Sequence, residues 1–140
     1  MRISDHYRPF EHKTVIAVTN NEKARLLKAE GREVEEIEVI NTPETAPIER
    51  SMSKHGAGEA DFDAMKLHRL KELYAALSDR LRDMLAHEGF AEAIVCVPEV
   101  NKNTFAEYVP SDMQKKIAEV VPKNLASMDI PHIVRILLEG

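Results

Sequence analysis

Residues 60–88 read ADFDAMKLHRLKELYAALSDRLRDMLAHE, and they form the longest periodic stretch of the chain. Apolar side chains recur there at steps of three and four, with no Gly or Pro after the first of them. They are Leu67, Leu70, Leu73, Tyr74, Leu77, Leu81, Met84 and Leu85. This spacing predicts an amphipathic helix whose apolar stripe covers a sheet. The side predicted to face solvent carries Lys71, Glu72, Ser78, Asp79 and Arg82.

The first turns of this helix have a different pattern. Lys66 lies in line with the later apolar stripe, while Phe62 and Met65 lie to one side of it. We therefore expect the beginning of the helix to project beyond the sheet. The preceding residues 41–58 contain two Pro, two Gly and no periodicity, which predicts a long loop. Loops of this length in compact domains are usually functional or disordered.

Three segments before the loop have the composition of strands. Residues 14–19 are rich in β-branched side chains and end at a turn that contains Asn20. Residues 23–29 and 32–40 flank a Gly-containing turn, and the second of them nearly alternates polar with apolar residues. We predict that these three strands form a meander. Residues 1–13 have no period and are predicted to be an extension that is ordered by docking.

A buried strand is predicted directly after the long helix. Gly89 suits the position just past a helix end. Residues 93–97 are apolar at consecutive positions, as in strands that are covered on both faces, and Pro98 ends the run. A strand, a helix and a second strand in this order predict a right-handed parallel unit.

The last part of the chain predicts two more helices and a strand. Ser111 and Gln114 have capping-box spacing, which predicts a short helix over residues 112–120. Residues 122–128 are predicted as a short strand, and Pro131 as the first residue of a helix that ends at Gly140. The resulting order βββαβαβα predicts an α/β fold with a ribonuclease H-like mixed sheet, in a single domain over residues 14–140.

Composition limits the class of protein. The chain has 140 residues, of which 44% are hydrophobic and 31% charged, as expected for one globular domain. No apolar run approaches the roughly 20 residues that span a bilayer, and residues 1–13 lack the apolar core of a signal peptide. We expect a cytoplasmic protein without membrane insertion. The net charge of −5 argues against a generic nucleic-acid coating protein.

The predicted strand order makes a nuclease the first enzyme to test. Such an enzyme holds two metal ions about 4 Å apart with several carboxylates. The first predicted strand carries none, and the fourth reaches none until Glu99. The six His residues, at 6, 12, 55, 68, 87 and 132, have no metal-ligand spacing, and the single Cys96 lies in an apolar run that predicts a buried, inert thiol. We predict no catalytic residues, no metal and no cofactor.

Basic residues gather around the expected start of the long helix. From Arg50 to Lys71 there are five Lys or Arg and three acidic residues, a local charge of +2 that leaves −7 on the rest of the chain. We call the basic set the collar, and it consists of Arg50, Lys54, His55, Lys66, His68, Arg69 and Lys71. One interpretation is a solvated helix start, since surface charge is common. The other is an RNA- or partner-binding site whose cations attract phosphate.

Several segments resemble the bacterial host-attachment protein family over residues 13–140. They are Lys13-Thr-Val-Ile-Ala-Val18, Lys23-Ala-Arg-Leu-Leu27, the long helix, Ala93-Ile-Val-Cys-Val-Pro98 and Pro122-Lys-Asn-Leu-Ala-Ser-Met-Asp-Ile-Pro-His-Ile133. The resemblance implies a role in attachment to host cells. It also implies a fold similar to the middle domain of archaeal and eukaryotic peptide-chain release factors and of Pelota.

The resemblance does not carry over the hydrolytic motif of release factors. In those proteins a Gly-Gly-Gln loop before the long helix enters the peptidyl-transferase centre. Here the corresponding place reads Lys54-His-Gly-Ala-Gly-Glu-Ala60, and Glu59 stands nearest to the Gln. A carboxylate repels phosphate and presents no amide. The sequence also has Thr19-Asn20 where the family usually has an Asp at the end of the first strand.

Two classes of function remain. The first is a non-enzymatic interaction module that contacts the ribosome or structured RNA through the loop and the collar, or an unknown protein partner. The second is a metal-dependent or acid/base hydrolase that uses Glu59, Asp61, His55 and His68. Salt should weaken the first activity, and a chelator should abolish a metal-dependent form of the second. We prefer the first.

Overall fold

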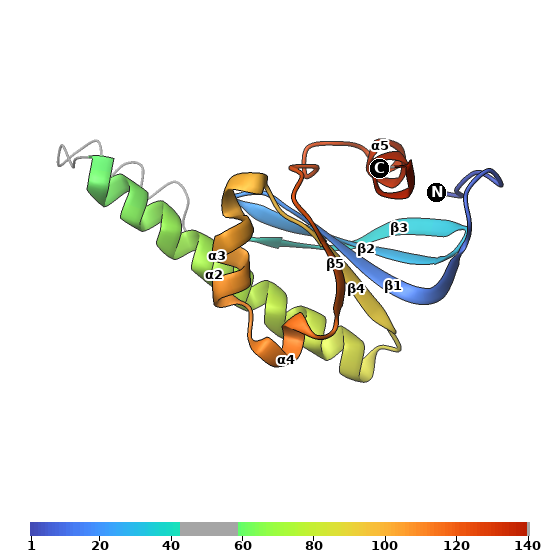
Figure 1. Ribbon diagram of the computed structural model, residues 1–140, viewed down its shortest axis with the longest axis horizontal. Coiled ribbons are helices and arrows are strands. Elements are labelled where there is room, and N and C mark those ends of the chain that lie inside the picture. The colour runs from blue at the N-terminus through green and yellow to red at the C-terminus, as the bar shows by residue number, and fades with distance from the viewer. Residues whose placement is uncertain (43–58, 140) are drawn as a thin grey trace.

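A five-stranded mixed sheet is the centre of the computed structural model, which describes residues 1–42 and 59–139 (Figure 1). The elements are β1 (Phe10–Thr19), β2 (Lys23–Gly31), β3 (Glu33–Asn41), α2 (Glu59–His87), β4 (Glu92–Cys96), the 3-10 helix η1 (Glu99–Asn101), α3 (Lys102–Tyr108), α4 (Ser111–Gln114), β5 (Ile117–Val121) and α5 (Ile130–Glu139). The strand order is β3-β2-β1-β4-β5. The first three strands are antiparallel, and β4 and β5 run parallel to β1. The predicted α/β fold, meander and long helix are confirmed.

Helices cover both faces of the sheet, so two hydrophobic layers form. On one face α2, α3 and α4 pack on the sheet, and Leu73, Leu77 and Phe105 are buried there (Figure 1). On the other face α5 buries Ile133 and Val134 against the strands. Because successive strand residues point to opposite faces, the consecutive apolar residues of β1 and β4 fill both layers.

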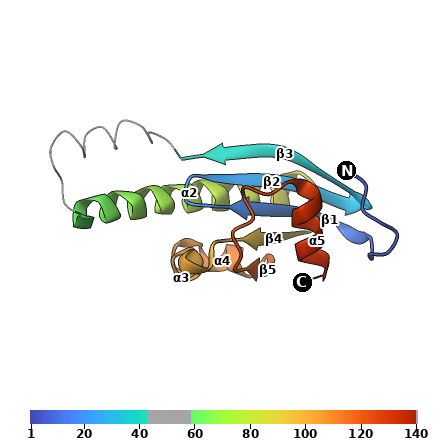
Figure 2. The same ribbon diagram turned by 90° about the horizontal axis from the view of Figure 1, so that it is seen from above.

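The predicted apolar stripe of α2 is confirmed from Leu70 onward and is wrong at Leu67. Leu67 is 41% exposed because the beginning of α2 extends past the end of the sheet, as predicted (Figure 2). Ser78, predicted to face solvent, is only 3% exposed. It lies four residues after Tyr74 and three before Leu81, so it shares their buried side of the helix.

Residues 112–120 do not form the predicted helix. The helix α4 ends at Gln114, and Ile117–Val121 is instead the edge strand β5. Pro110 occupies the N-cap position, and its carbonyl accepts hydrogen bonds from the N–H groups of Met113 and Gln114. The capping box is therefore absent, and the β-branched residues that follow pair with β4.

Two further corrections concern the flanking segments. The predicted strand over residues 122–128 is irregular backbone with a turn, and η1 and α3 were not predicted. The last helix begins at Ile130, one residue before Pro131, because the Asp129 carboxylate accepts a hydrogen bond from the His132 N–H at 3.1 Å. Among the described residues, no helix is long and apolar enough to cross a membrane.

The beginning of the chain packs against the edge strand β3. Ile3 is 1% exposed, and its N–H donates to the Arg32 carbonyl at 2.7 Å. Val34 donates its N–H to the Met1 carbonyl at 2.8 Å. The strand β1 begins at Phe10, four residues before the predicted start at Thr14. The polar extension is thus ordered by docking.

Candidate functional site

The collar is partly described, at the projecting beginning of α2. Lys66 and His68 are exposed there, whereas Arg69 and Lys71 are half-buried. The other predicted members, Arg50, Lys54 and His55, lie outside the described residues. The loop predicted over residues 41–58 also lies outside them, apart from Asn41 at the end of β3 and the buried Thr42.

Two contacts orient the described collar residues. The His68 Nε2 lies 2.9 Å from the Glu72 carboxylate, one helical turn later. The Lys71 ammonium lies 4.7 Å from the centre of the Tyr108 ring, at the end of α3. This cation–π contact holds Lys71 toward α3 and adds an aromatic ring to the basic surface. Tyr108 was missed in the sequence because α3 was not predicted, and no local pattern connects it with Lys71.

A second candidate place lies where the parallel strands β1 and β4 end. A hollow of about 330 Å³ is lined there by Asn20, Asn21, Glu22, Pro98, Val100 and Asn124. Crevices beyond the carboxyl ends of parallel strands are common ligand sites in α/β sheets. The turn geometry is fixed because Asn20 Oδ1 accepts hydrogen bonds from the N–H groups of Glu22 and Lys23, both at 2.8 Å.

A buried polar layer lies at the same ends of β1 and β4. Thr19 Oγ1 donates to the Cys96 carbonyl at 2.8 Å, and Asn101 Nδ2 donates to Asn21 Oδ1 at 2.6 Å. The Tyr74 hydroxyl is buried next to this layer. Burial raises the pKa of Tyr74 to about 12, and the side chains of Asn101 and Thr19 oppose the shift. Tyr74 therefore stays protonated at neutral pH.

This strand-end hollow lacks the ligand set of a two-metal nuclease. Among the described residues, Glu22 is the only carboxylate that lines it, and the strand ends supply Thr19 and Asn20 instead of acids. The described part of the chain holds no group of three or more His, Cys, Asp or Glu with metal-binding geometry. The arrangement offers amide and hydroxyl hydrogen bonds and no pair of facing acids.

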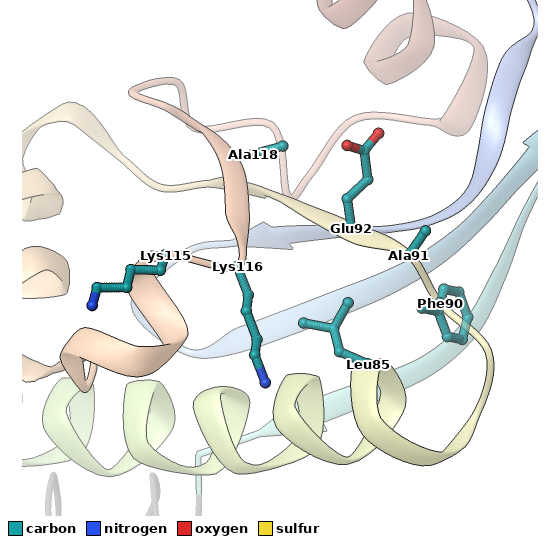
Figure 3. Close-up of a pocket in the computed structure, with 7 residues that line it drawn as sticks. All are labelled: Leu85, Phe90, Ala91, Glu92, Lys115, Lys116 and Ala118. Carbon is teal, nitrogen blue, oxygen red and sulfur yellow. The ribbon is translucent and has the colours of Figure 1, made fainter.

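Figure 3 shows a third hollow, of about 450 Å³, between the end of α2 and the beginnings of β4 and β5. Lys116 points toward α2, near Leu85, while Lys115 points away from it (Figure 3). The Glu92 carboxylate points to the other side of the sheet (Figure 3). Among the described residues that line this hollow, the carboxylate and the two lysines thus do not face one another.

Cys96 is the only thiol of the chain, and it is fully buried in the sheet. Burial raises its pKa to about 12, so the thiol is neutral and inert at physiological pH. The interpretation of Cys96 as a packing residue is confirmed.

One family model matches this chain. It is described as "Bacterial archaeo-eukaryotic release factor family 10", and the match covers residues 6–131. The matched range runs from the segment before β1 to the beginning of α5, and it includes the whole of α2 and the hollow at the strand ends. No curated protein matches the chain.

Proposed function

The chain belongs to bacterial archaeo-eukaryotic release factor family 10, and from this premise we propose that it contacts the ribosome or structured RNA as a non-enzymatic, translation-related module. The contact surface is the projecting beginning of α2 with its collar. We propose that its cations neutralise phosphates and read no base sequence.

The projection of α2 beyond the sheet carries this proposal (Figure 2). A helix end that extends past the body of a domain can enter a groove that the sheet itself cannot reach. Lys66 and His68 are exposed there, and Lys71 is held beside Tyr108. Each phosphate contact by a Lys or Arg adds affinity that depends on salt, even in a chain of net charge −5.

Peptidyl-tRNA hydrolysis is not part of the proposal. The sequence places Glu59 where release factors carry the Gln of the Gly-Gly-Gln motif. A hydrolase that uses carboxylates and His stays the alternative. The side chains of Glu59, Asp61 and His55 lie outside the described residues, and His68 contacts Glu72. Host attachment through a protein partner is a further alternative, which rests on the sequence resemblance alone.

Co-sedimentation with ribosomes tests the proposal. We expect the wild type to sediment with ribosomes at low salt. The logarithm of its affinity should fall with the logarithm of salt concentration, with a slope of about −0.7 to −0.9 per phosphate neutralised. The double variant Lys66→Glu/Lys71→Glu should lose co-sedimentation. Arg69 is left unchanged because its Nε is fully buried.

The matched control is Arg8→Glu/Arg135→Glu, which makes the same change of charge at exposed positions outside the collar. It should sediment like the wild type. If the wild type does not sediment, or both double variants bind equally well, the proposed contact is wrong. Release of product from an RNA or peptidyl-tRNA substrate, suppressed by a chelator, would favour the metal-dependent alternative.

A further inference from the structure

The strand-end hollow and the beginning of α2 lie at the same end of the molecule (Figure 2). The strands β1, β3 and β4 run in the same direction and end at the edge of the sheet from which α2 projects (Figure 2). Lys71 of the collar precedes Tyr74 by about one helical turn, and the Tyr74 hydroxyl is buried next to the polar layer of these strand ends. An RNA strand held at Lys71 is therefore within reach of the hollow.

Two asparagines of the hollow have their side-chain oxygens occupied by the protein itself. Asn20 Oδ1 accepts from the N–H groups of Glu22 and Lys23, both at 2.8 Å, and Asn21 Oδ1 accepts from Asn101 Nδ2 at 2.6 Å. Within residues 1–42 and 59–139, the Nδ2 groups of Asn20 and Asn21 make no hydrogen bond. An amide nitrogen only donates, so two donors are left for a ligand, each on a side chain that is already anchored.

Glu22 supplies the complementary group. Its side chain lines the hollow, and an ionised carboxylate only accepts hydrogen bonds. Asn124 also lines the hollow and offers one more amide. Pro98 and Val100 supply apolar surface, and Val100 is 87% exposed. The hollow therefore combines fixed donors, one acceptor-only group and an apolar wall.

The charge around this hollow is balanced. The charged residues next to its lining positions in the chain are Lys23, Glu99 and Lys123, and Glu22 lies in the hollow itself. Two lysines thus stand beside two acids. Net charge selects no ligand here, so hydrogen bonds and shape decide what fits.

A second hollow, beside β5, lacks these features. It has a volume of about 240 Å³ and is lined by Lys102, Phe105, Ala106, Gln114, Ile117 and Val120. The Gln114 amide nitrogen already donates to the carbonyls of Ala106 and Val109, at 2.7 and 2.8 Å. The rest of its lining is mostly apolar, so this hollow offers little for polar recognition.

We propose that the strand-end hollow binds a guanine base. Guanine carries two adjacent donors, N1–H and N2–H, which together suit one carboxylate, and two acceptors, O6 and N7, which suit amide nitrogens. Adenine and cytosine offer the carboxylate a single amino group. Uracil fits worst, because its N3–H lies between two carbonyl oxygens that a carboxylate repels. The volume of about 330 Å³ is at the lower end of ligand pockets, about 300–1,000 Å³, and suits one base.

An unpaired guanine of RNA and a free guanine nucleotide carry the same base. Proteins read unpaired RNA bases by hydrogen bonds to their edges. The RNA source rests on the proposed function, since the collar would hold the neighbouring phosphates. The preference for guanine depends on the hollow alone.

NMR titration of the ¹⁵N-labelled full chain with GMP, AMP, CMP and UMP tests the proposal. The four nucleotides share sugar and phosphate, so their differences report the base. We expect GMP to shift the side-chain amide signals of Asn20, Asn21 and Asn124 saturably and to bind at least about tenfold more tightly than UMP. Glu22→Gln should lose most of this preference, because a neutral amide can donate to the carbonyl oxygens of uracil.

The matched control is Glu11→Gln, the same change at an exposed position at the beginning of β1, and it should keep the preference. If Glu22→Gln does not fold, Asn124→Ala replaces it, with the exposed Asn103→Ala as control. Asn124→Ala should weaken GMP binding, and Asn103→Ala should not. Equal binding of the four nucleotides, unshifted asparagine amides with GMP, or an unchanged preference in Glu22→Gln would each overturn the proposal.

Fluorescence anisotropy with two labelled oligonucleotides distinguishes the sources of the base. One is a uridine tract and the other carries a single central guanosine. Tighter binding of the second assigns the hollow to RNA, whereas a preference seen only with GMP assigns it to a free nucleotide. Lys66→Glu/Lys71→Glu should weaken both oligonucleotides and keep the GMP preference, and Glu22→Gln should still sediment with ribosomes. The two proposals therefore fail separately.

Discussion

The two ends of α2 belong to one uninterrupted helix, yet they relate differently to the rest of the molecule (Figure 1). From Leu70 to Met84 its large apolar side chains are buried against the sheet, whereas Met65 and Leu67 are exposed. The later part is stabilised by tertiary packing. At the beginning of α2, the described side chains stabilise the helix through contacts within the helix itself, such as the His68–Glu72 pair at 2.9 Å. A helical period therefore indicates a helix without indicating what covers it.

A charged network strengthens the anchored part of α2. Arg80 lies 3.0 Å from Glu38 of β3, and it also pairs with Asp83 and with Glu88 after the helix. The hydrogen bond from Arg80 holds the pKa of Glu88 below its usual value. The helix is thus tied to the edge of the sheet at the end opposite to the collar.

The largest loss of stability is expected from a substitution at the centre of the anchored part of α2. Leu77 is fully buried, so Leu77→Ala leaves a cavity and should lower the free energy of unfolding by about 2–5 kcal/mol. Urea denaturation followed by circular dichroism measures it. A change below about 0.5 kcal/mol, the size of a surface effect, would show that the helix does not cover the sheet in this way.

An intermediate effect on stability is expected for Arg80→Ala. This variant should lower the free energy of unfolding by about 1 kcal/mol at neutral pH, because the ion pairs that Arg80 forms are partly exposed. The pKa of Glu88 is lowered in the folded state, so its stabilising contribution is present above the unfolded pKa and is lost as the pH falls through the folded pKa. The difference between wild type and variant should therefore shrink below about pH 4.

Urea denaturation across pH 3 to 7 checks this prediction. Asp83→Ala is the comparison variant, since it removes the more exposed local partner of Arg80 and leaves Glu38 and Glu88 in place. Its effect should be smaller. A difference between wild type and Arg80→Ala that stays constant with pH would contradict the assigned role of Glu88.

The smallest effect is expected at the projecting beginning of α2. Leu67→Ala makes the same change as Leu77→Ala in the same helix, but Leu67 is 41% exposed. We expect a change within about 0.5 kcal/mol, since Ala favours helix and little apolar area is lost. Parallel urea titrations of the two variants compare the two parts directly. Equal losses of stability would mean that Leu67 is covered in solution.

Residues 112–128 show where sequence patterns were ambiguous. The segment Ile117–Val121 is a short strand at the edge of the sheet. Ser111 and Gln114 have the spacing of a capping box, but no capping box forms there. A four-residue helix and a five-residue strand leave too few repeats for a period to decide between them. The pairing of β5 with β4, which links distant residues, decided this part of the fold.

The collar was predictable only as a group of neighbours along the chain. Lys66, His68, Arg69 and Lys71 lie on consecutive turns of a helix that the sequence predicts, so their approximate proximity followed from helical geometry. The exposure of each side chain did not follow, and neither did the contact between Lys71 and Tyr108. The two hollows at β5 and at the ends of β1 and β4 each join side chains from separate segments of the chain.

Local sequence patterns were sufficient to predict the three antiparallel strands, the long helix, the buried strand β4 and the burial of Cys96. Hydrophobic period and β-branched composition act over a few residues, so they can be read locally. The tertiary structure was needed to show that Ser78 is buried, and that β5 is the last strand of the described sheet and lies beside an apolar hollow. These features depend on where one element ends against another, and that is set by packing between residues far apart in the chain.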